Sequence, residues 1–241
     1  MAGLSEIGIG EGLYIVDLGL VLKEEQCLVL ADFHIGYEEA LNKQGVLVPR
    51  FSFQDILSRL KPLLKQSYNT IIINGDLKHE FGEISNQEWQ ETQQILDLLK
   101  SKTKHLVLIK GNHDTILEPI ARRKDVSIRD YIMFQGVYIT HGHKLPSDVD
   151  FHRANTVIIA HEHPAVSIRD GLRSELFKCF LVGRYEQKKL VVMPSFNPIT
   201  PGSDVRKQKL LSPFLTHGIN EFEVYVVEDK VYYFGRLKDL E

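Results

Sequence analysis

Seven Asp, Asn and His residues that could bind metal ions follow five short apolar runs of this chain. The runs span 27–31, 71–73, 106–109, 137–140 and 157–160, and they are rich in Val, Ile and Leu, as buried strands are. Ligands of open α/β sheets gather outside the carboxyl ends of the strands, so we expect one shared site. Its candidate ligands are Asp32, His34, Asp76, Asn112, His141, His161 and His163.

Three oxygen ligands and four imidazoles are too many for one ion, so the set predicts two ions that share a carboxylate. If Asp76 is the bridge, the first ion takes Asp32, His34 and one of the last two histidines. The second takes Asn112, His141 and the other histidine. Mixed oxygen and imidazole ligands without thiolate suit divalent Mn, Fe, Co, Ni or Zn, with Mn the expected metal, and do not resemble an all-oxygen Ca or Mg site.

Two ions about 3.5–4 Å apart can bridge a hydroxide, lower its pKa and stabilise an in-line displacement at phosphorus. Hydrolysis of a phosphoester is therefore the expected reaction. His113 is not needed as a ligand, which leaves it to face the substrate and protonate the leaving group. Asp114 could orient His113 through a hydrogen bond.

Each motif alone has a simpler explanation. An isolated Asp-x-His or Gly-Asp after a strand is more often part of a turn. The pairs His141-Gly-His143 and His161-Glu-His163 could be surface histidines. In this order, each at the end of an apolar run, the motifs favour one metal site.

The first half of the sequence predicts alternating strands and helices. Ser85 and Glu88 form a capping box for the clearest helix, which lies between two apolar strands. A strand, a helix and a strand imply a right-handed crossover and parallel neighbours, which would bring Asp76 and Asn112 to one edge of the sheet. The expected strands are 13–22, 27–31 and 70–74. The expected helices are 37–44, 52–65 and one that starts at Ser85 and is ended by the stretch 100–104.

The second half predicts strands alone. After Val126 the apolar segments are short and strand-like, and 221–235 reads as a hairpin around Glu228-Asp229. The Pro-rich stretch 194–216 is a long irregular connection. Such loops are often functional, so we place it over the mouth of the site.

Length and composition are those of one globular domain over residues 1–241. No apolar stretch approaches the roughly 20 residues that span a bilayer, and the N-terminus lacks the pattern of a secretory signal, so the expected location is cytoplasmic, without membrane contact. The net charge of −3 argues against a general electrostatic attraction to nucleic acid. Cys27 and Cys179 lie in separate apolar segments and are expected in the core. No pattern specifies an oligomeric state.

The five motifs resemble the signature of the calcineurin-like metallophosphoesterase superfamily, from Asp32 to His163. The resemblance implies an α/β fold, a β-sandwich of two mixed sheets flanked by helices in a four-layer αββα arrangement. It also implies His113 as the catalytic acid. One metal would bind Asp32, His34, Asp76 and His163, and the other Asp76, Asn112, His141 and His161.

The chain departs from the superfamily pattern at three places. Ala160 stands where the last block usually has Gly, and Glu162 replaces a small or hydroxyl residue between the paired histidines. In the second block, Lys78 and His79 occupy positions where many relatives have an acidic residue or Asn. Either could bind phosphate, and an exposed turn position is the alternative for His79.

Four further segments resemble an archaeal branch related to the SbcD-type nuclease and to ligase-associated phosphodiesterases. Within them, Arg50 is a candidate phosphate clamp, because a guanidinium binds two phosphate oxygens at once, and an ordinary surface arginine is the alternative. The expected partner is a phosphoester substrate, such as a nucleotide or a DNA end. The segments are 31–40, 48–51, 75–80 and 194–198.

Three functions compete on this basis. The first is a phosphodiesterase that hydrolyses nucleotide or nucleic-acid phosphodiesters through a metal-bridging hydroxide. The second is a phosphomonoesterase on a small phosphate ester, which would use the same centre. The third is a non-catalytic scaffold, as in the retromer subunit of this fold. The complete ligand set and the presence of His113 disfavour the scaffold.

Overall fold

The computed structural model describes residues 5–48, 51–79, 85–114, 117–171 and 173–240. A mixed, seven-stranded sheet forms its first layer of strands, in the order β1-β2-β3-β4-β5-β6-β7. Strands β1 to β4 pair antiparallel, and β4 to β7 pair parallel. The strands are β1 (Glu6–Gly8), β2 (Leu13–Val16), β3 (Gly19–Leu22), β4 (Cys27–Leu30), β5 (Tyr68–Asn74), β6 (Thr103–Ile109) and β7 (Ser127–Arg129).

The prediction of one strand over 13–22 is wrong. The chain reverses at Asp17, where φ is 53°, and β2 and β3 form a hairpin in which Leu13 lies opposite Leu22. Both strands are almost entirely buried, so their apolar residues run on without the alternation that would mark two strands. A single Asp is a weak turn signal in such a run.

The second sheet is also mixed, in the order β14-β11-β12-β13-β10-β9-β8, with β15 and β16 added beside β12. Strand β10 pairs parallel with both β9 and β13. The strands are β8 (Tyr131–Phe134), β9 (Val137–Thr140), β10 (Thr156–Ile159), β11 (Pro164–Asp170), β12 (Arg173–Tyr185), β13 (Lys188–Val192), β14 (Ser203–Asp204), β15 (Glu223–Val227) and β16 (Val231–Arg236).

Five α-helices are described. Ser85 caps α3 by accepting a hydrogen bond from Glu88 N at 3.1 Å, as the capping box predicts. The prediction that helices end after Val126 is wrong, because α5 forms where Asp148 accepts a hydrogen bond from Phe151 N. This helix is too short to show a periodic pattern. The helices are α1 (Tyr37–Lys43), α2 (Ser52–Leu63), α3 (Asn86–Lys100), α4 (Glu118–Lys124), α5 (Val149–Arg153) and the 3-10 helices η1 (Pro213–Leu215) and η2 (Leu237–Asp239).

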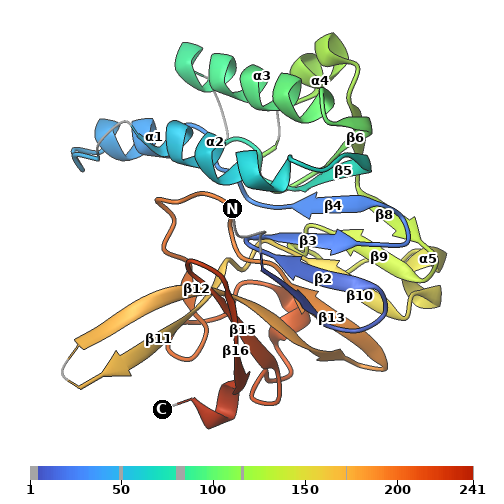
Figure 1. Ribbon diagram of the computed structural model, residues 1–241, viewed down its shortest axis with the longest axis vertical. Coiled ribbons are helices and arrows are strands. Elements are labelled where there is room, and N and C mark those ends of the chain that lie inside the picture. The colour runs from blue at the N-terminus through green and yellow to red at the C-terminus, as the bar shows by residue number, and fades with distance from the viewer. Residues whose placement is uncertain (1–4, 49–50, 80–84, 115–116, 172, 241) are drawn as a thin grey trace.

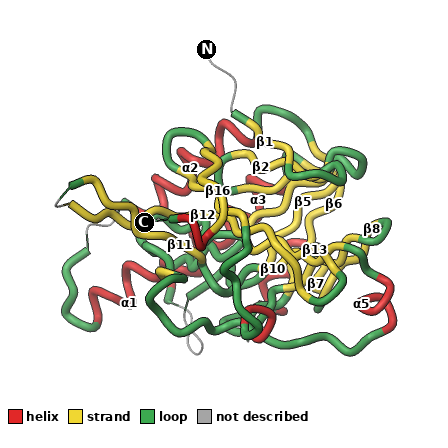
Figure 2. Tube along the Cα trace, turned by 90° about the horizontal axis from the view of Figure 1, so that it is seen from below, coloured by secondary structure: helices red, strands yellow, loops and turns green. Residues whose placement is uncertain are grey.

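The two sheets pack face to face, with α1 to α4 beside the first sheet (Figure 1). Leu28 and Ile72 of the first sheet share one buried cluster with Ile158 and Phe180 of the second. A second cluster lies on the other side of the second sheet, where α5 and η1 contribute Phe151 and other apolar side chains. The expected sandwich of two mixed sheets with outer helices is confirmed. Figure 2 traces the same chain from below, with helices, strands and loops in different colours.

Among the described residues, none of the helices has the length and apolar character needed to cross a membrane. Cys27 and Cys179 are buried free thiols in the core, as expected.

Candidate metal centre

The turns after β4 and β5 bring the first candidate ligands together. Parallel pairing continues beyond the strands, because Asp32 N donates to Gly75 O at 3.2 Å and His34 N donates to Asp76 O at 2.9 Å. Ile35 N continues the pattern with the next carbonyl along. The sequence pattern predicted that these residues follow strands that end at one shared site, and the register places them side by side.

The turn after β6 joins this pair through the bridging candidate. His113 N donates to Asp76 Oδ1 at 2.9 Å. A Cβ added to Gly111 would lie 2.0 Å from the same oxygen, so only glycine permits the approach. Asp114 is 6% exposed and accepts from Leu77 N at 3.1 Å and from Gly111 N at 3.0 Å. Its carboxylate thus ties the turn after β6 to the turn after β5.

The second sheet supplies the remaining histidines from the turns after β9 and β10. Ala160 N donates to His141 O at 2.9 Å, and His161 N donates to Asp32 Oδ2 at 3.2 Å, which links the two sheets. Close approach of the sheets requires Gly75, because a Cβ there would lie 2.0 Å from His141 Nδ1. The Gly of the Gly-Asp motif therefore has a steric reason.

The predicted ligands form two neighbouring groups. Within each group, one ligand atom per residue lies within 4.8 Å of the others, a spacing that could hold an ion. His163 Nε2 lies 3.3 Å from Asp32 Oδ2 in the first group, and His141 Nε2 lies 3.3 Å from Asp76 Oδ2 in the second. The groups are Asp32, His34 and His163, and Asp76, His141 and His161.

Two contacts complete the arrangement. His34 Nε2 lies 3.8 Å from Asp76 Oδ2, so Asp76 borders both groups, as a bridging ligand must. Asn112 Oδ1 lies 3.1 Å from His141 Nε2, beside the second group. All seven predicted ligand residues thus meet in one place, and His163 falls with Asp32 as the resemblance implies.

The donor set fits divalent transition metals. Asp32 and His141 are fully buried and Asp76 is 2% exposed. Asp32 Oδ1 and His34 Nδ1 are buried atoms without a hydrogen-bond partner, an arrangement that is costly unless another group, such as a cation, compensates it. Carboxylate, amide and imidazole donors without thiolate suit Mn, Fe, Co, Ni or Zn.

The backbone of the centre is strained. Positive φ angles are rare for residues other than glycine and cost of order 1–3 kcal/mol each, and they cluster at functional sites. Five of the seven candidate ligands have such angles, which aim their side chains at a common point. They are Asp32 (53°), His34 (42°), Asp76 (47°), His161 (67°) and His163 (49°).

Electrostatics keep most ligands in the protonation state that metals require. Burial lowers the pKa of His34 to about 3 and that of His161 to about 4, with a neighbouring histidine adding to each shift. Burial opposes ionisation of Asp76, but its hydrogen bond with His141 and the charge of that imidazole hold the pKa of the Asp76 carboxyl well below its usual range. His141 is the exception among the imidazoles: burial lowers its pKa, but the hydrogen bond with Asp76 and the charges of Asp32 and Asp76 outweigh burial and raise it to about 9, so His141 must lose a proton to bind a metal. Neutral imidazoles and ionised carboxylates are the ligand forms.

His113 and His79 lie beside the centre. His113 Nδ1 donates to His79 O at 2.6 Å, and the His113 ring stands edge-on to the His34 ring at 5.0 Å between centroids. The imidazoles of His34, His79 and His113 form a third close group, so His79 is more than an exposed turn residue. The fully buried Lys78 donates to His113 O at 2.8 Å and fixes this turn from behind. Arg50 lies outside the described residues.

The partners of Asp114 differ from the predicted one, and segment 194–216 has contacts that the sequence did not show. Asp114 was expected to orient His113, yet both of its carboxylate oxygens accept from backbone amides of other residues. Burial raises the pKa of Asp114 to about 7. Segment 194–216, which we predict to lie over the mouth of the site, bonds the backbone of the ligand-bearing turns, as with Ser195 Oγ to Asp32 O. No sequence signal distinguished these partners.

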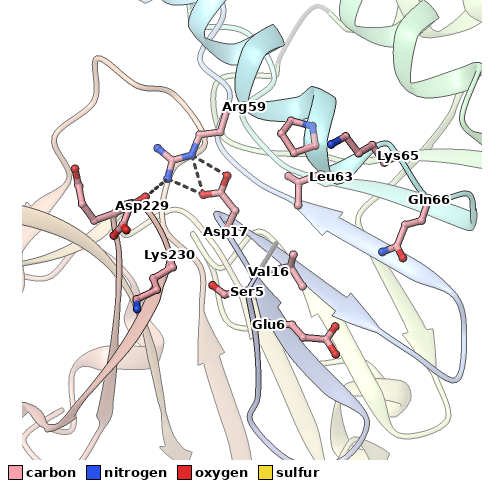
Figure 3. A pocket seen from close by; sticks show the side chains of 12 residues that line it. Ser5, Glu6, Val16, Asp17, Arg59, Leu63, Lys65, Gln66, Asp229 and Lys230 are labelled. Carbon is pink, nitrogen blue, oxygen red and sulfur yellow. Dashed lines mark hydrogen bonds and ion pairs between the residues drawn. The ribbon is translucent and has the colours of Figure 1, made fainter. Parts of the chain in front are cut away.

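A surface cavity of about 810 Å³ lies apart from the candidate ligands, between α2, the β2–β3 turn and the β15–β16 turn (Figure 3). Its central feature is a fork in which Arg59 Nε donates to both oxygens of Asp17, at 2.8 and 3.0 Å. Arg59 also donates to Glu228 O. The charges of Arg59 and Asp17 are therefore paired with each other.

A β-sandwich whose strand ends bring Asp, Asn and His side chains into two neighbouring groups has the architecture of a metal-dependent phosphoesterase. The calcineurin-like phosphoesterase family matches residues 26–219, and the chain belongs to that family. Dinuclear metal sites are a property of the family, in keeping with the two groups described above.

A solved structure that covers nearly all of the chain has the same fold. Nuclease MPE from Pseudomonas putida is similar with a TM-score of 0.69 and 18% identity, over 96% of this chain and 100% of that one. Vps29 from Entamoeba histolytica, complexed with zinc, matches with a TM-score of 0.36 and 15% identity, over 86% of this chain and 96% of that one. Among curated protein sequences, none matches this chain significantly.

Proposed function

We propose that the protein is a two-metal phosphodiesterase that hydrolyses nucleotide or nucleic-acid phosphodiesters. The observation that carries this proposal is the position of Asp76, which borders both ligand groups. A carboxylate at that position can hold two ions close together. Bound divalent ions would lower the pKa of water and neutralise charge on the phosphoryl oxygens.

The chain's own residues would hold the ions in two sets. Asp32, His34 and His163 would bind one ion, and His141, His161 and Asn112 the other, with Asp76 shared. Burial of the carboxylates excludes bulk water from around the ions, which strengthens their attraction for the anionic phosphoester. We expect Mn²⁺ to support activity, with Fe, Zn, Ni or Co as alternatives.

His113 would act as the general acid. Its Nδ1 is committed to the carbonyl of His79, so a proton added at Nε2 makes an imidazolium that can donate to a leaving oxygen. Lys78 holds the same turn through His113 O, which limits movement of the ring. Asp114, tied to two backbone amides, would support the turn rather than the ring itself.

Two further observations support a diester substrate. The similar structure that covers nearly all of this chain carries the name of a nuclease. The segments at 31–40, 75–80 and 194–198 resemble the SbcD-related and ligase-associated branch. His79 and Arg50 are proposed to contact the phosphate, His79 because its ring lies 5.4 Å from that of His113.

The test compares two substrates. Wild-type protein with Mn²⁺ is expected to hydrolyse bis-p-nitrophenyl phosphate faster than p-nitrophenyl phosphate, and a chelator is expected to abolish both activities. Faster hydrolysis of the monoester would replace the proposal with a phosphomonoesterase. Failure of every transition metal to support turnover of either ester would favour a non-catalytic scaffold.

A further inference from the structure

The long irregular segment between β13 and β15 contacts the first ligand turn at three successive carbonyls. Ser195 Oγ donates to Asp32 O at 2.7 Å. Asn197 Nδ2 donates to Phe33 O at 2.7 Å and to His34 O at 3.1 Å. One short stretch of chain thus bonds the whole backbone of the turn that carries two candidate ligands.

This turn needs such support. Asp32 and His34 both have positive φ angles, of 53° and 42°, and strained conformations persist only where the surroundings over-determine them. Ser195 and Asn197 are buried at 0% and 1% exposure, so their hydrogen bonds are shielded from competing water. The ring of Phe196 also packs at 5.0 Å from that of Phe33, between centroids.

The segment is itself anchored to the second sheet. Lys178 of β12 donates through Nζ to Ser195 O at 2.8 Å and to Asn197 O. Asn197 Oδ1 accepts from Ile199 N at 2.9 Å, which fixes the orientation of the amide. The two residues that hold the first ligand turn are therefore held in place from behind.

The far end of the same segment bonds both ligand turns of the second sheet. Glu162, between the paired histidines, accepts from Leu211 N at 2.8 Å and from Ser212 N at 2.9 Å. Ser212 Oγ donates to Gly142 O at 2.8 Å, directly after the ligand His141. Ser212 thus connects the turn after β9 to the turn after β10, and the unusual Glu162 has a structural partner.

The middle of the segment touches the last ligand. Ser203 N donates to His163 O at 2.8 Å. A Cβ added to Gly202 would lie 2.6 Å from the same carbonyl, so glycine is required for the approach. From one end to the other, the segment bonds three of the five ligand-bearing turns.

We propose that residues 195–212 form a positioning brace of the metal centre, in which Asn197 holds the first ligand turn and Ser212 holds the turns of the second sheet. This inference rests on the proposed two-metal site. Asn197 acts on the turn of Asp32 and His34, which are candidate ligands of one ion, whereas Ser212 acts on the two turns that carry His141 and His161, candidate ligands of the other. Loss of Asn197 therefore weakens the ion at Asp32. Loss of the Glu162 anchor weakens chiefly the ion at His141, although His163 on the same turn belongs to the first group.

The first test measures metal binding without any substrate. Wild-type protein is expected to bind two Mn²⁺ ions in equilibrium dialysis, with an EPR spectrum of a coupled pair. Asn197→Ala is expected to lower the affinity for one ion by ~10–100-fold, as changes behind metal ligands typically do, and to shift the spectrum toward that of a single ion.

Asn42→Ala is the matched control. Asn42 also bonds the backbone with its side-chain amide, to Glu38 O at 2.8 Å and Val48 O at 3.1 Å, but it lies in the last turn of α1 and touches none of the candidate ligands in these bonds. We expect this variant to bind two ions as tightly as the wild type. Equal Mn²⁺ binding by Asn197→Ala and Asn42→Ala would overturn the brace.

A second pair of variants tests the other end and guards against misfolding of Asn197→Ala. Glu162→Ala removes the acceptor of Leu211 N and Ser212 N, and is expected to weaken the second ion by ~10–100-fold. Glu162→Gln keeps a carbonyl oxygen at that position and is expected to recover most of the affinity. Equal weakening in both variants would show that these hydrogen bonds do not position the site.

The outcomes separate the brace from the proposed function. If the wild type binds two Mn²⁺ ions but hydrolyses neither nitrophenyl ester, the proposed function fails, and the brace is still judged by the variants' metal affinity. If the wild type binds no Mn²⁺, the brace has no centre to position and is overturned.

Discussion

The metal centre and the Arg59–Asp17 cavity both gather charged residues, but they treat charge in opposite ways. In the cavity, Asp17 accepts a forked pair of hydrogen bonds from Arg59, so each charge meets its opposite (Figure 3). In the metal centre, Asp32 and Asp76 are buried beside histidines, and Asp32 Oδ1 has no hydrogen-bond partner.

The two regions also differ in backbone strain, which is greater in the metal centre. Five candidate metal ligands have positive φ angles, whereas in the cavity lining only Asp17 does, at the turn of a hairpin where such an angle is ordinary. Backbone strain together with unpaired buried polar atoms indicates a ligand-binding site. The volume of a cavity alone does not indicate one. Variants of the metal centre should therefore lose metal binding or activity, whereas variants of the cavity should lose only stability.

The largest effect is expected from Asp76→Asn. The shared ligand loses its charge, so both Mn²⁺ ions should bind more weakly by well over the ~10–100-fold typical of residues that only contact ligands. Hydrolysis of both nitrophenyl esters should fall to background. Measurement of bound metal after dialysis checks this, and two tightly held ions per chain would contradict the bridging assignment.

The second-largest effect is expected from His113→Ala, which should lower turnover without loss of metal binding. Both ions should remain bound, while turnover of an alkyl phosphodiester should fall by ~10²–10⁴-fold, because its poor leaving group needs a proton. Activated nitrophenyl esters should lose much less. An equal loss on both kinds of substrate would rule out leaving-group protonation as the role of His113.

Lys178 lies between the two regions and should report on both through pH. Burial lowers the pKa of Lys178 to about 7, with a further contribution from Arg59, whereas Asp32 and Asp17 oppose the shift. The ordinary pKa is 10.5. Between pH 7 and that value the unfolded chain holds a proton that the folded chain has released, so folding becomes more favourable as pH rises.

The check uses chelator-treated protein and Lys178→Met. Urea unfolding at pH 6.5, 8 and 9.5 should show the free energy of unfolding of the wild type gaining on that of the variant as pH rises. A gap that is constant or shrinks over this range would contradict the lowered pKa.

The smallest effect is expected from Asp17→Asn in the cavity. The ion pair is partly exposed, with side chains 15% and 31% accessible, so its loss should cost about 1 kcal/mol of unfolding free energy. Mn²⁺ binding and ester hydrolysis should match the wild type. A large loss of activity would break the contrast between the regions and extend the functional site to this cavity.

The pattern of strand ends was enough to predict the candidate ligands. Each buried strand appears in the sequence as an apolar run, and an Asp, Asn or His that could bind a metal follows within a few residues of its end. Order along the chain therefore predicted that Asp76 and Asn112 meet at one sheet edge, and the parallel register of β5 and β6 agrees. The helix after Ser85 was likewise predicted from residues that are close together in the sequence.

Local patterns failed where burial is uniform or elements are short. The β2–β3 hairpin lies within a continuous apolar run, and α5 spans only one turn or so of helix. Neither offers the repeated contrast between buried and exposed positions on which periodicity depends.

The sequence by itself determined which residue types stand at the strand ends, and hence the chemistry available to this protein. Only the tertiary structure decided that Asp114 bonds backbone amides and that Glu162 meets Ser212. Periodicity records the burial of each element separately. Partners far apart in the chain depend on strand register and on how the two sheets pack, which no local pattern encodes.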